Sequence, residues 1–209
     1  MMLYKDRIDA GNKLAASMHK YKNMKDTIVL GLARGGIIVA YEVAQALGLP
    51  LDITCPRKIG APYNPEYAIG AITETGQGFF NYEAIETLGV SDRYIQQEVE
   101  KETKTALHRV QSYRKNLPPR NLKGKTVILI DDGIATGATL EAAIASVKSE
   151  GAKKIVVAVP VAPPRTLMDL KQKVDEVICL MSPSSFYAIG QFYEEFSQVT
   201  DEEVMERLH

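Results

Sequence analysis

The run VILIDDGIATGATLEAAI, residues 127–144, determines how the rest of the chain is interpreted. Apolar, mostly β-branched residues lead directly into two adjacent aspartates, Asp131 and Asp132, and a loop of small residues and threonines follows. Beyond that loop the apolar residues recur with helical spacing. This order of features predicts a buried strand, a tight loop and a helix that begins where the loop ends.

The same alternation of strand and helix recurs along the chain. Short apolar runs predict strands at residues 27–32, 51–55, 126–130, 154–159 and 175–180. Helical spacing predicts helices at residues 9–21, 37–47, 92–116 (with Ser91 as cap), 140–149 and 165–171. We therefore expect an α/β fold, with an open, mainly parallel twisted sheet and helices on both faces.

Two segments interrupt this alternation. Residues 56–78 contain three prolines and four glycines, which predict a mobile loop or hairpin with one short strand at 68–73. The tail, residues 181–209, ends in a predicted helix capped by Thr200. We expect one domain over residues 1–209, with a core at about 25–180 and a hood formed mainly by the tail together with the N-terminal helix.

Composition excludes several classes of protein. The chain has 209 residues and a net charge of −1, so we expect no broad basic surface and no nucleic-acid partner. It has neither an apolar run long enough to cross a membrane nor the pattern of a signal peptide, which predicts a cytoplasmic protein without a membrane partner. Cys55 and Cys179 are expected to be buried thiols, and the scattered cysteines and histidines form no metal-ligand pattern.

Three predicted loops leave the carboxyl ends of strands, where parallel sheets bind their ligands: 33–36, 56–75 and 131–139. In the third loop, two glycines let the backbone approach a ligand, and the N–H groups at the start of the helix form an anion site. Adjacent carboxylates suit the hydroxyls of a diol, or Mg²⁺. A sugar phosphate combines these groups. The alternative is an ordinary strand-to-helix turn with two solvated aspartates, whereas the Walker A and dinucleotide-binding patterns are absent.

The segment VILIDDGIATGAT closely resembles the phosphoribosyl-pyrophosphate (PRPP) binding motif of the type I phosphoribosyltransferase family. LARGG resembles the pyrophosphate loop of that family, and PRKIG resembles its second anion-binding segment. The likeness covers most of the chain and is greatest for a bacterial group labelled only "predicted phosphoribosyltransferase". It implies a transferase (EC 2.4.2.-) that moves the 5-phosphoribosyl group of PRPP to a nucleobase or similar nitrogenous acceptor and releases pyrophosphate. It also implies a homodimer.

The resemblance assigns roles to individual residues. Asp131 and Asp132 would hold the ribose hydroxyls. Arg57 and Lys58 would neutralise the leaving pyrophosphate, which would meet a loop that in this family often contains a non-proline cis peptide: Ala33, Arg34, Gly35 and Gly36. The 5-phosphate would be bound by the backbone and hydroxyl groups of Gly133, Ile134, Ala135, Thr136, Gly137, Ala138 and Thr139. The implied cofactor is Mg²⁺, bridging PRPP oxygens and contacting the protein mainly through water, with the two aspartates as the candidate direct ligands.

This assignment agrees with the chemistry of the reaction. Displacement of pyrophosphate at C1 builds positive charge on the ribose, which paired carboxylates favour, while cations favour the charge on the leaving group. Water must be excluded because it would hydrolyse PRPP. The segment 61–75 is therefore the candidate lid, within which Tyr63, Glu66 and Tyr67 are either functional or ordinary surface residues.

The acceptor is less clearly indicated. In 6-oxopurine members of the family an acidic residue occupies the position of Ala135, whereas adenine-type members carry alanine there; RGG, however, is more similar to the xanthine–guanine members. In the tail, Phe186 and Tyr187 are candidates to stack on a base and Ile189 to read its edge through the backbone, although they are equally suited to packing. Arg165 is a weaker candidate.

Two other functions fit the same sequence. One is a regulatory protein that binds PRPP or a nucleotide on this fold with little turnover. The other is a hydrolase of PRPP, or a transferase with an acceptor that is not a base. The basic residues Arg34, Arg57 and Lys58 favour the enzyme, because a sensor has no need to expel pyrophosphate.

Overall fold

A five-stranded parallel sheet forms the centre of the molecule in a computed structural model, which describes residues 3–209 apart from the side chain of Glu66. All neighbouring strands are parallel. In spatial order they are β2 (Leu51–Thr54), β1 (Thr27–Leu32), β6 (Thr126–Ile130), β7 (Lys154–Val161) and β8 (Glu176–Met181). This confirms the expected α/β class, and each of the five strands predicted for this sheet lies within two residues of its observed bounds.

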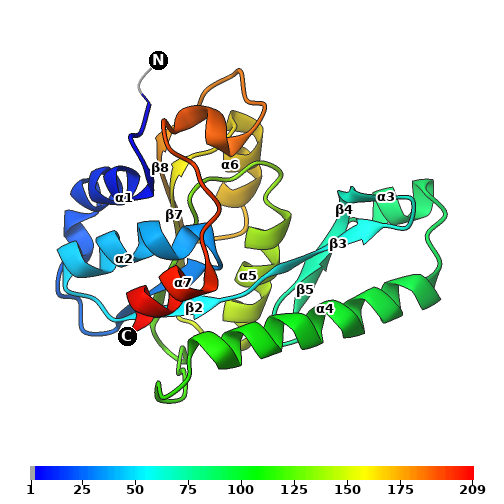
Figure 1. The fold of residues 1–209 in the computed structure, drawn as a ribbon, viewed down its shortest axis with the longest axis horizontal. Coiled ribbons are helices and arrows are strands. Elements are labelled where there is room, and N and C mark those ends of the chain that lie inside the picture. Colours follow the sequence, from blue (N-terminus) through cyan, green and yellow to red (C-terminus); the bar gives the residue numbers. More distant parts are fainter. Residues whose placement is uncertain (1–2) are drawn as a thin grey trace.

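Helices cover both faces of this sheet (Figure 1). One face packs against α1 (Arg7–Ala16) and α2 (Gly35–Leu47), and the other packs against α5 (Ala138–Ser149) and α6 (Pro164–Lys171). Successive residues of β1, such as Val29 and Leu30, enter these two different cores. Burial on both faces is the reason that the central strands are continuously apolar rather than alternating.

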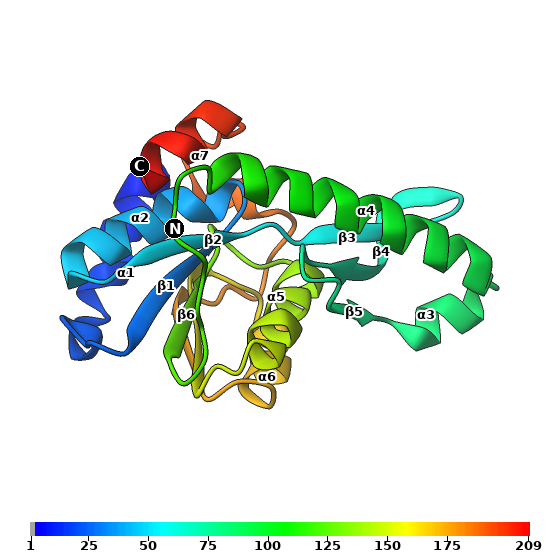
Figure 2. The same ribbon diagram turned by 90° about the horizontal axis from the view of Figure 1, so that it is seen from below.

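Residues 57–113 form a separate projection, here called the flap, which extends from the edge of the sheet (Figure 2). It contains β3 (Arg57–Ala61), β4 (Asn64–Ile72), β5 (Gly78–Phe80), α3 (Tyr82–Thr87) and α4 (Asp92–Tyr113). The three strands are antiparallel, and with the two helices they enclose a core that includes Ile59 and Ile69. The hairpin expected here is confirmed, but the expectation of a single short strand was wrong. Gly60 lies at a register shift in the pairing of β3 with β4 and packs closely against Pro65. The glycine and proline that predicted a break in the strand therefore belong to a bulged hairpin.

The N-terminal segment pairs with the tail at residues 192–194. Tyr4 N–H donates to Phe192 O and Glu194 N–H donates to Tyr4 O, both at 2.8 Å. The tail forms a short 3₁₀ turn, η2 (Ile189–Phe192), and then α7 (Asp201–Leu208), which packs against α2 and α4 and is capped by Thr200 as expected. The N-terminal helix is shorter than its predicted range, because α1 ends at Ala16 and a separate 3₁₀ turn, η1 (His19–Tyr21), follows.

Helices that combine the length and the apolar composition needed to cross a membrane are absent from the described part of the chain.

Candidate active site

Two loops meet at the carboxyl edge of the central sheet. One joins β1 to α2 through residues 33–34, and the other joins β6 to α5 through residues 131–137. Since β1 and β6 are hydrogen-bonded neighbours, their loops emerge side by side. A Cβ added at Gly36 would lie 2.8 Å from Asp131 Oδ1, and one added at Gly35 would collide with Asp132 Oδ2. The two glycines therefore let the first loop pack directly against the two carboxylates.

The first loop has an unusual backbone. The peptide bond between Ala33 and Arg34 is cis, as the family resemblance leads one to expect. Ala33 N–H donates to Thr54 O of β2 at 2.9 Å, which fixes the loop to the neighbouring strand. Gly35 then begins α2, so the segment reaches the edge of the sheet as a tight turn.

The acid pair is largely enclosed by protein. Asp132 is buried, and its Oδ2 accepts a hydrogen bond of 2.7 Å from Arg7 Nε of α1, in an ion pair whose side chains are only 10–11% exposed. Asp131 is half-buried, and its Oδ1 accepts from the backbone N–H of Asp132 at 2.9 Å. The hydroxyl of Tyr193 donates to the backbone oxygen of Asp132. The aspartates are therefore held in place rather than solvated.

This environment changes the acidity of both carboxyls. Burial raises the pKa of Asp131 well above its usual value, and the negative charge of Asp132 raises it further. Burial also raises the pKa of Asp132, although the guanidinium of Arg7 opposes that rise. Because Arg7 pairs with Asp132 and brings a single positive charge, the two carboxyls together carry uncompensated negative charge when both are ionised. The site therefore favours a ligand that brings hydroxyl donors or positive charge.

The second loop is shaped for an anion. Gly137 has φ +84°, a conformation that favours glycine, and it immediately precedes α5. Ile134 N–H donates to Val161 O and Thr166 Oγ1 donates to Ala135 O, both at 2.9 Å, so neighbouring segments fix the turn. Thr136 is exposed at its tip. The N–H groups at the start of a twelve-residue helix lie beside this turn, an arrangement that suits a phosphate.

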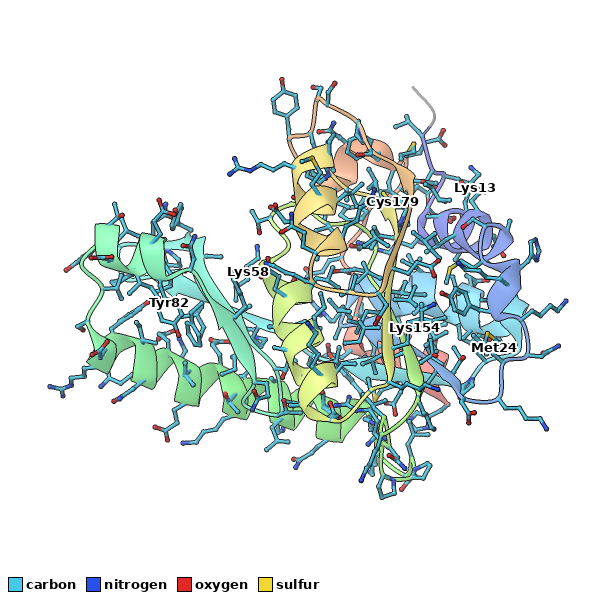
Figure 3. All side chains as sticks on the ribbon, turned by 180° about the vertical axis from the view of Figure 1, so that it is seen from behind. Lys13, Met24, Lys58, Tyr82, Lys154 and Cys179 are labelled. Carbon is cyan, nitrogen blue, oxygen red and sulfur yellow. The ribbon has the colours of Figure 1, made fainter. Side chains whose placement is uncertain are left out.

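The predicted cationic residues are not gathered at one point. Arg34 lies 3.4 Å from Asp201 of α7, and Arg57 is paired at 2.7 Å with Glu102 of α4. Lys58 projects between the flap and α5 (Figure 3). There it lines a cavity of about 300 Å³ whose other lining residues are Tyr67, Ala68, Phe79, Asn81, Thr136, Ala138 and Glu141. The structure thus brings Lys58 beside the second loop, while Arg57 engages the opposite side of the flap.

The acceptor candidates of the tail have mixed surroundings. Phe186 packs against Phe192, with ring centroids 5.1 Å apart. Tyr187 is 89% exposed, and Ile189 covers Gly133, where an added Cβ would lie 2.6 Å from Ile189 Cγ2. Among the lid candidates, Tyr63 is exposed, and the side chain of Glu66 lies outside the described part of the structure.

Side chains of the N-terminal helix and the tail surround the acid pair, and the sequence did not predict them. Arg7 precedes Asp132 by 125 residues, and Tyr193 follows it by 61. The ring of Phe196 lies beneath the guanidinium of Arg7, with its centroid 3.9 Å from Cζ. No spacing pattern marks these residues, because the pairing depends on the tail and the N-terminal segment lying together.

The cavity with the greatest volume among those described lies elsewhere. It encloses about 520 Å³ at the amino ends of β1, β6 and β7, where Thr27 and Thr126 contribute to its wall. Its three lysines and two aspartates nearly balance in charge, and Lys154 is already engaged by Glu176 at 3.3 Å. Position therefore favours the carboxyl edge as the functional site, because ligands of parallel sheets bind there.

A parallel α/β sheet with an acid pair and two glycine-containing loops at its carboxyl edge defines the type I phosphoribosyltransferase class. The phosphoribosyl transferase domain model matches residues 2–197, and the chain belongs to this family. The chain is 41% identical to the protein TT1426 from Thermus thermophilus, whose crystal structure it matches with a TM-score of 0.83 over 99% of this chain and 98% of that one. A purine phosphoribosyltransferase from Pyrococcus horikoshii shares the fold, with 21% identity, a TM-score of 0.51 and 93% of each chain covered.

A protein of Mycobacterium tuberculosis (strain CDC 1551 / Oshkosh), whose name assigns it provisionally to the phosphoribosyl transferases, is 38% identical over 212 residues. The match covers all of this chain and 48% of that protein, so the chain spans about half the length of its curated relative.

Proposed function

We propose that this chain transfers the 5-phosphoribosyl group of PRPP to a nucleobase or similar nitrogenous acceptor, with Mg²⁺, and releases pyrophosphate. The observation that carries the proposal is the contact of Gly35 and Gly36 with Asp132 and Asp131. Through this contact, the loop suited to pyrophosphate and the carboxylates suited to the ribose diol share one surface, beside a loop suited to the 5-phosphate. One PRPP molecule spans those three features.

The acid pair supplies the electrostatic part of the proposed reaction. Loss of pyrophosphate from C1 leaves positive charge on the ribose ring, and two carboxylates beneath the ring stabilise that charge. The leaving group carries negative charge, which Mg²⁺ and Arg34 would balance. The flap, with Lys58 facing the 5-phosphate loop, is proposed to close over the ligand and exclude water.

The residues present fit a magnesium ion that is held largely by its substrate. Within residues 3–209, no three His, Cys, Asp or Glu side chains gather into a closed ligand set. Asp131 and Asp132 offer neighbouring carboxylates at this edge, and Mg²⁺ commonly binds through one or two carboxylates together with substrate phosphates and water. The proposal also includes a homodimer and a cytoplasmic location, both of which stay predictions from the sequence.

A PRPP-binding regulator is the second candidate function. Two of the three predicted cations are engaged by acids, Arg34 by Asp201 and Arg57 by Glu102, so neither is directed at a leaving group while these pairs persist. A protein that only binds PRPP has no need to break these two ion pairs. Under the transferase proposal, Arg34 and Arg57 leave their acidic partners and bind pyrophosphate when the ligand enters the site.

One experiment separates the two functions. The protein is incubated with PRPP, Mg²⁺ and each of a panel of purine and pyrimidine bases, and pyrophosphate release is followed, with PRPP affinity measured in parallel by calorimetry. Release that depends on one base supports the transferase and identifies its acceptor. Tight PRPP binding without release under any acceptor supports the regulator, and release without an acceptor supports a hydrolase.

A further inference from the structure

We propose that Arg7, the first residue of α1, is a positioning residue for the ribose-binding carboxylate Asp132; this inference rests on the proposed function. The guanidinium Nε donates to Asp132 Oδ2 at 2.7 Å. Both side chains are almost wholly enclosed, so this pair is far less screened than a surface salt bridge.

The orientation of Arg7 is fixed from three directions. Its Nε binds Asp132, its Nη1 donates to Ser197 O at 2.8 Å, and its Cζ lies 3.9 Å above the centroid of the Phe196 ring. A stacked guanidinium with two directed hydrogen bonds has one orientation, unlike a flexible ammonium group. The tail and the N-terminal helix therefore act together to aim one cation at the acid pair.

The charge balance explains what this cation does. Asp131 and Asp132 are adjacent acids, and Arg7 pairs with the second of them at 2.7 Å. An ionised carboxyl offers only hydrogen-bond acceptors to the two hydroxyl groups of a diol, whereas the protonated form turns one of its oxygens into a donor. Arg7 supplies a positive charge beside Asp132 and occupies its Oδ2. The remaining lone pairs, chiefly those of Oδ1, are then presented to the ligand.

Arg7 acts on the ribose part of the ligand and not on the pyrophosphate part. The hydrogen bonds of Arg7 reach Asp132 and Ser197 O, whereas the pyrophosphate loop of residues 33–36, which Arg7 borders at Gly35, is held by the hydrogen bond from Ala33 N–H to Thr54 O. Removal of Arg7 should therefore lower the affinity for ligands that carry a ribose diol and leave the affinity for ligands without one unchanged. A general loosening of the fold would lower the affinity for both classes of ligand.

The test compares PRPP with inorganic pyrophosphate, each with Mg²⁺, by calorimetry on the wild-type chain and on Arg7→Met, Arg7→Lys and Lys13→Met. For Arg7→Met we expect PRPP affinity to fall by about tenfold or more, because one partner of a buried pair is lost, and pyrophosphate affinity to change by less than about twofold. Arg7→Lys keeps the charge and should recover part of the PRPP affinity. Lys13 lies on the same helix and pairs with Asp9, so Lys13→Met removes an equal charge without touching Asp132 and should change neither affinity (Figure 3).

The outcomes are distinguishable. Equal losses for PRPP and pyrophosphate, or unchanged PRPP affinity in Arg7→Met, would overturn the role of Arg7 and leave the transferase proposal standing. Failure of the wild-type chain to bind PRPP would overturn both. If Arg7→Met does not fold, Arg7→Lys decides: a selective loss of PRPP affinity supports the inference, and an unselective loss or no loss refutes it.

Discussion

Gly36 lies directly against Asp131: a Cβ at Gly36 would come 2.8 Å from Asp131 Oδ1 and equally close to the backbone oxygen of Ile130. This contact joins the first turn of α2 to the end of β6, and it leaves no room for a side chain. The spacing of the two candidate binding loops is therefore set by a glycine and an aspartate that are far apart in the chain.

Gly36→Ala should displace the acid pair from the first loop. We expect overpacking to cost about 1–3 kcal/mol of the free energy of unfolding, together with a large loss of PRPP affinity. Urea unfolding and calorimetry measure the two effects. Gly89→Ala is the stability-matched control: Gly89 has φ +61° and open space around it, so the substitution strains the backbone by about 1 kcal/mol without approaching the site. A Gly36→Ala protein that binds PRPP normally would disprove the importance of this contact.

The acid pair itself gives the most direct prediction. Asp131→Asn combined with Asp132→Asn should abolish PRPP binding or turnover, because neutral amides neither attract the developing ribose cation nor accept hydrogen bonds as strongly as carboxylates do. The fold should persist, as circular dichroism and thermal melting would show. Asp169→Asn, which changes an exposed aspartate on α6, is the control. Turnover that survives in the double variant would contradict the roles given to both residues.

The central fold was predictable because the responsible signals are local. Strand 27–32 and strand 126–130 are short apolar runs, buried on both faces, and their bounds follow from the residues themselves. The loops 33–36 and 131–139 were predictable for the same reason. The number of strands in the flap was not predictable, because Gly60 and Pro65 taken alone indicate a break, whereas in the structure they belong to a bulge between paired strands. Contacts between distant segments were hidden as well: nothing near Arg7 in sequence indicates Asp132.

The raised pKa of Asp131 predicts how stability depends on pH. Its carboxyl has a pKa above the unfolded value, because burial and the charge of Asp132 penalise ionisation in the folded state. The stability contribution of this group is thus fully present below its unfolded pKa and is lost as the pH rises through the folded pKa. Asp131→Asn cannot ionise, so it should be more stable than wild type at neutral pH, and the difference should shrink under acidic conditions.

Urea unfolding of both proteins across a series of pH values checks this prediction. Thermal melting gives a second measure over the same range. An Asp131→Asn protein that is less stable than wild type at neutral pH, or a difference between the two that does not change with pH, would show that the carboxyl of Asp131 is not under electrostatic strain in the folded protein.

Arg120 should be a principal determinant of the position of the flap. Its buried guanidinium pairs with Glu74 at 3.0 Å and with Glu150 at 2.9 Å, and it donates to Ile53 O at 2.8 Å. Glu74 in turn accepts from Thr54 Oγ1 and from the backbone N–H of Cys55, so this network holds both chain segments that connect the flap to the sheet.

Arg120→Met would leave the carboxylate of Glu74 buried without a cation, which should cost about 3–5 kcal/mol of the free energy of unfolding. Hydrogen exchange should also accelerate selectively in β3 and β4, because the connecting segments lose their anchor. Lys104→Met is the matched control: it removes one partner of the exposed Lys104–Glu100 pair on α4 and should cost less than about 1 kcal/mol. If the two variants lose equal stability, or if exchange in the flap stays at the wild-type rate in Arg120→Met, then packing of the flap against α5, and not the Arg120 network, fixes its position.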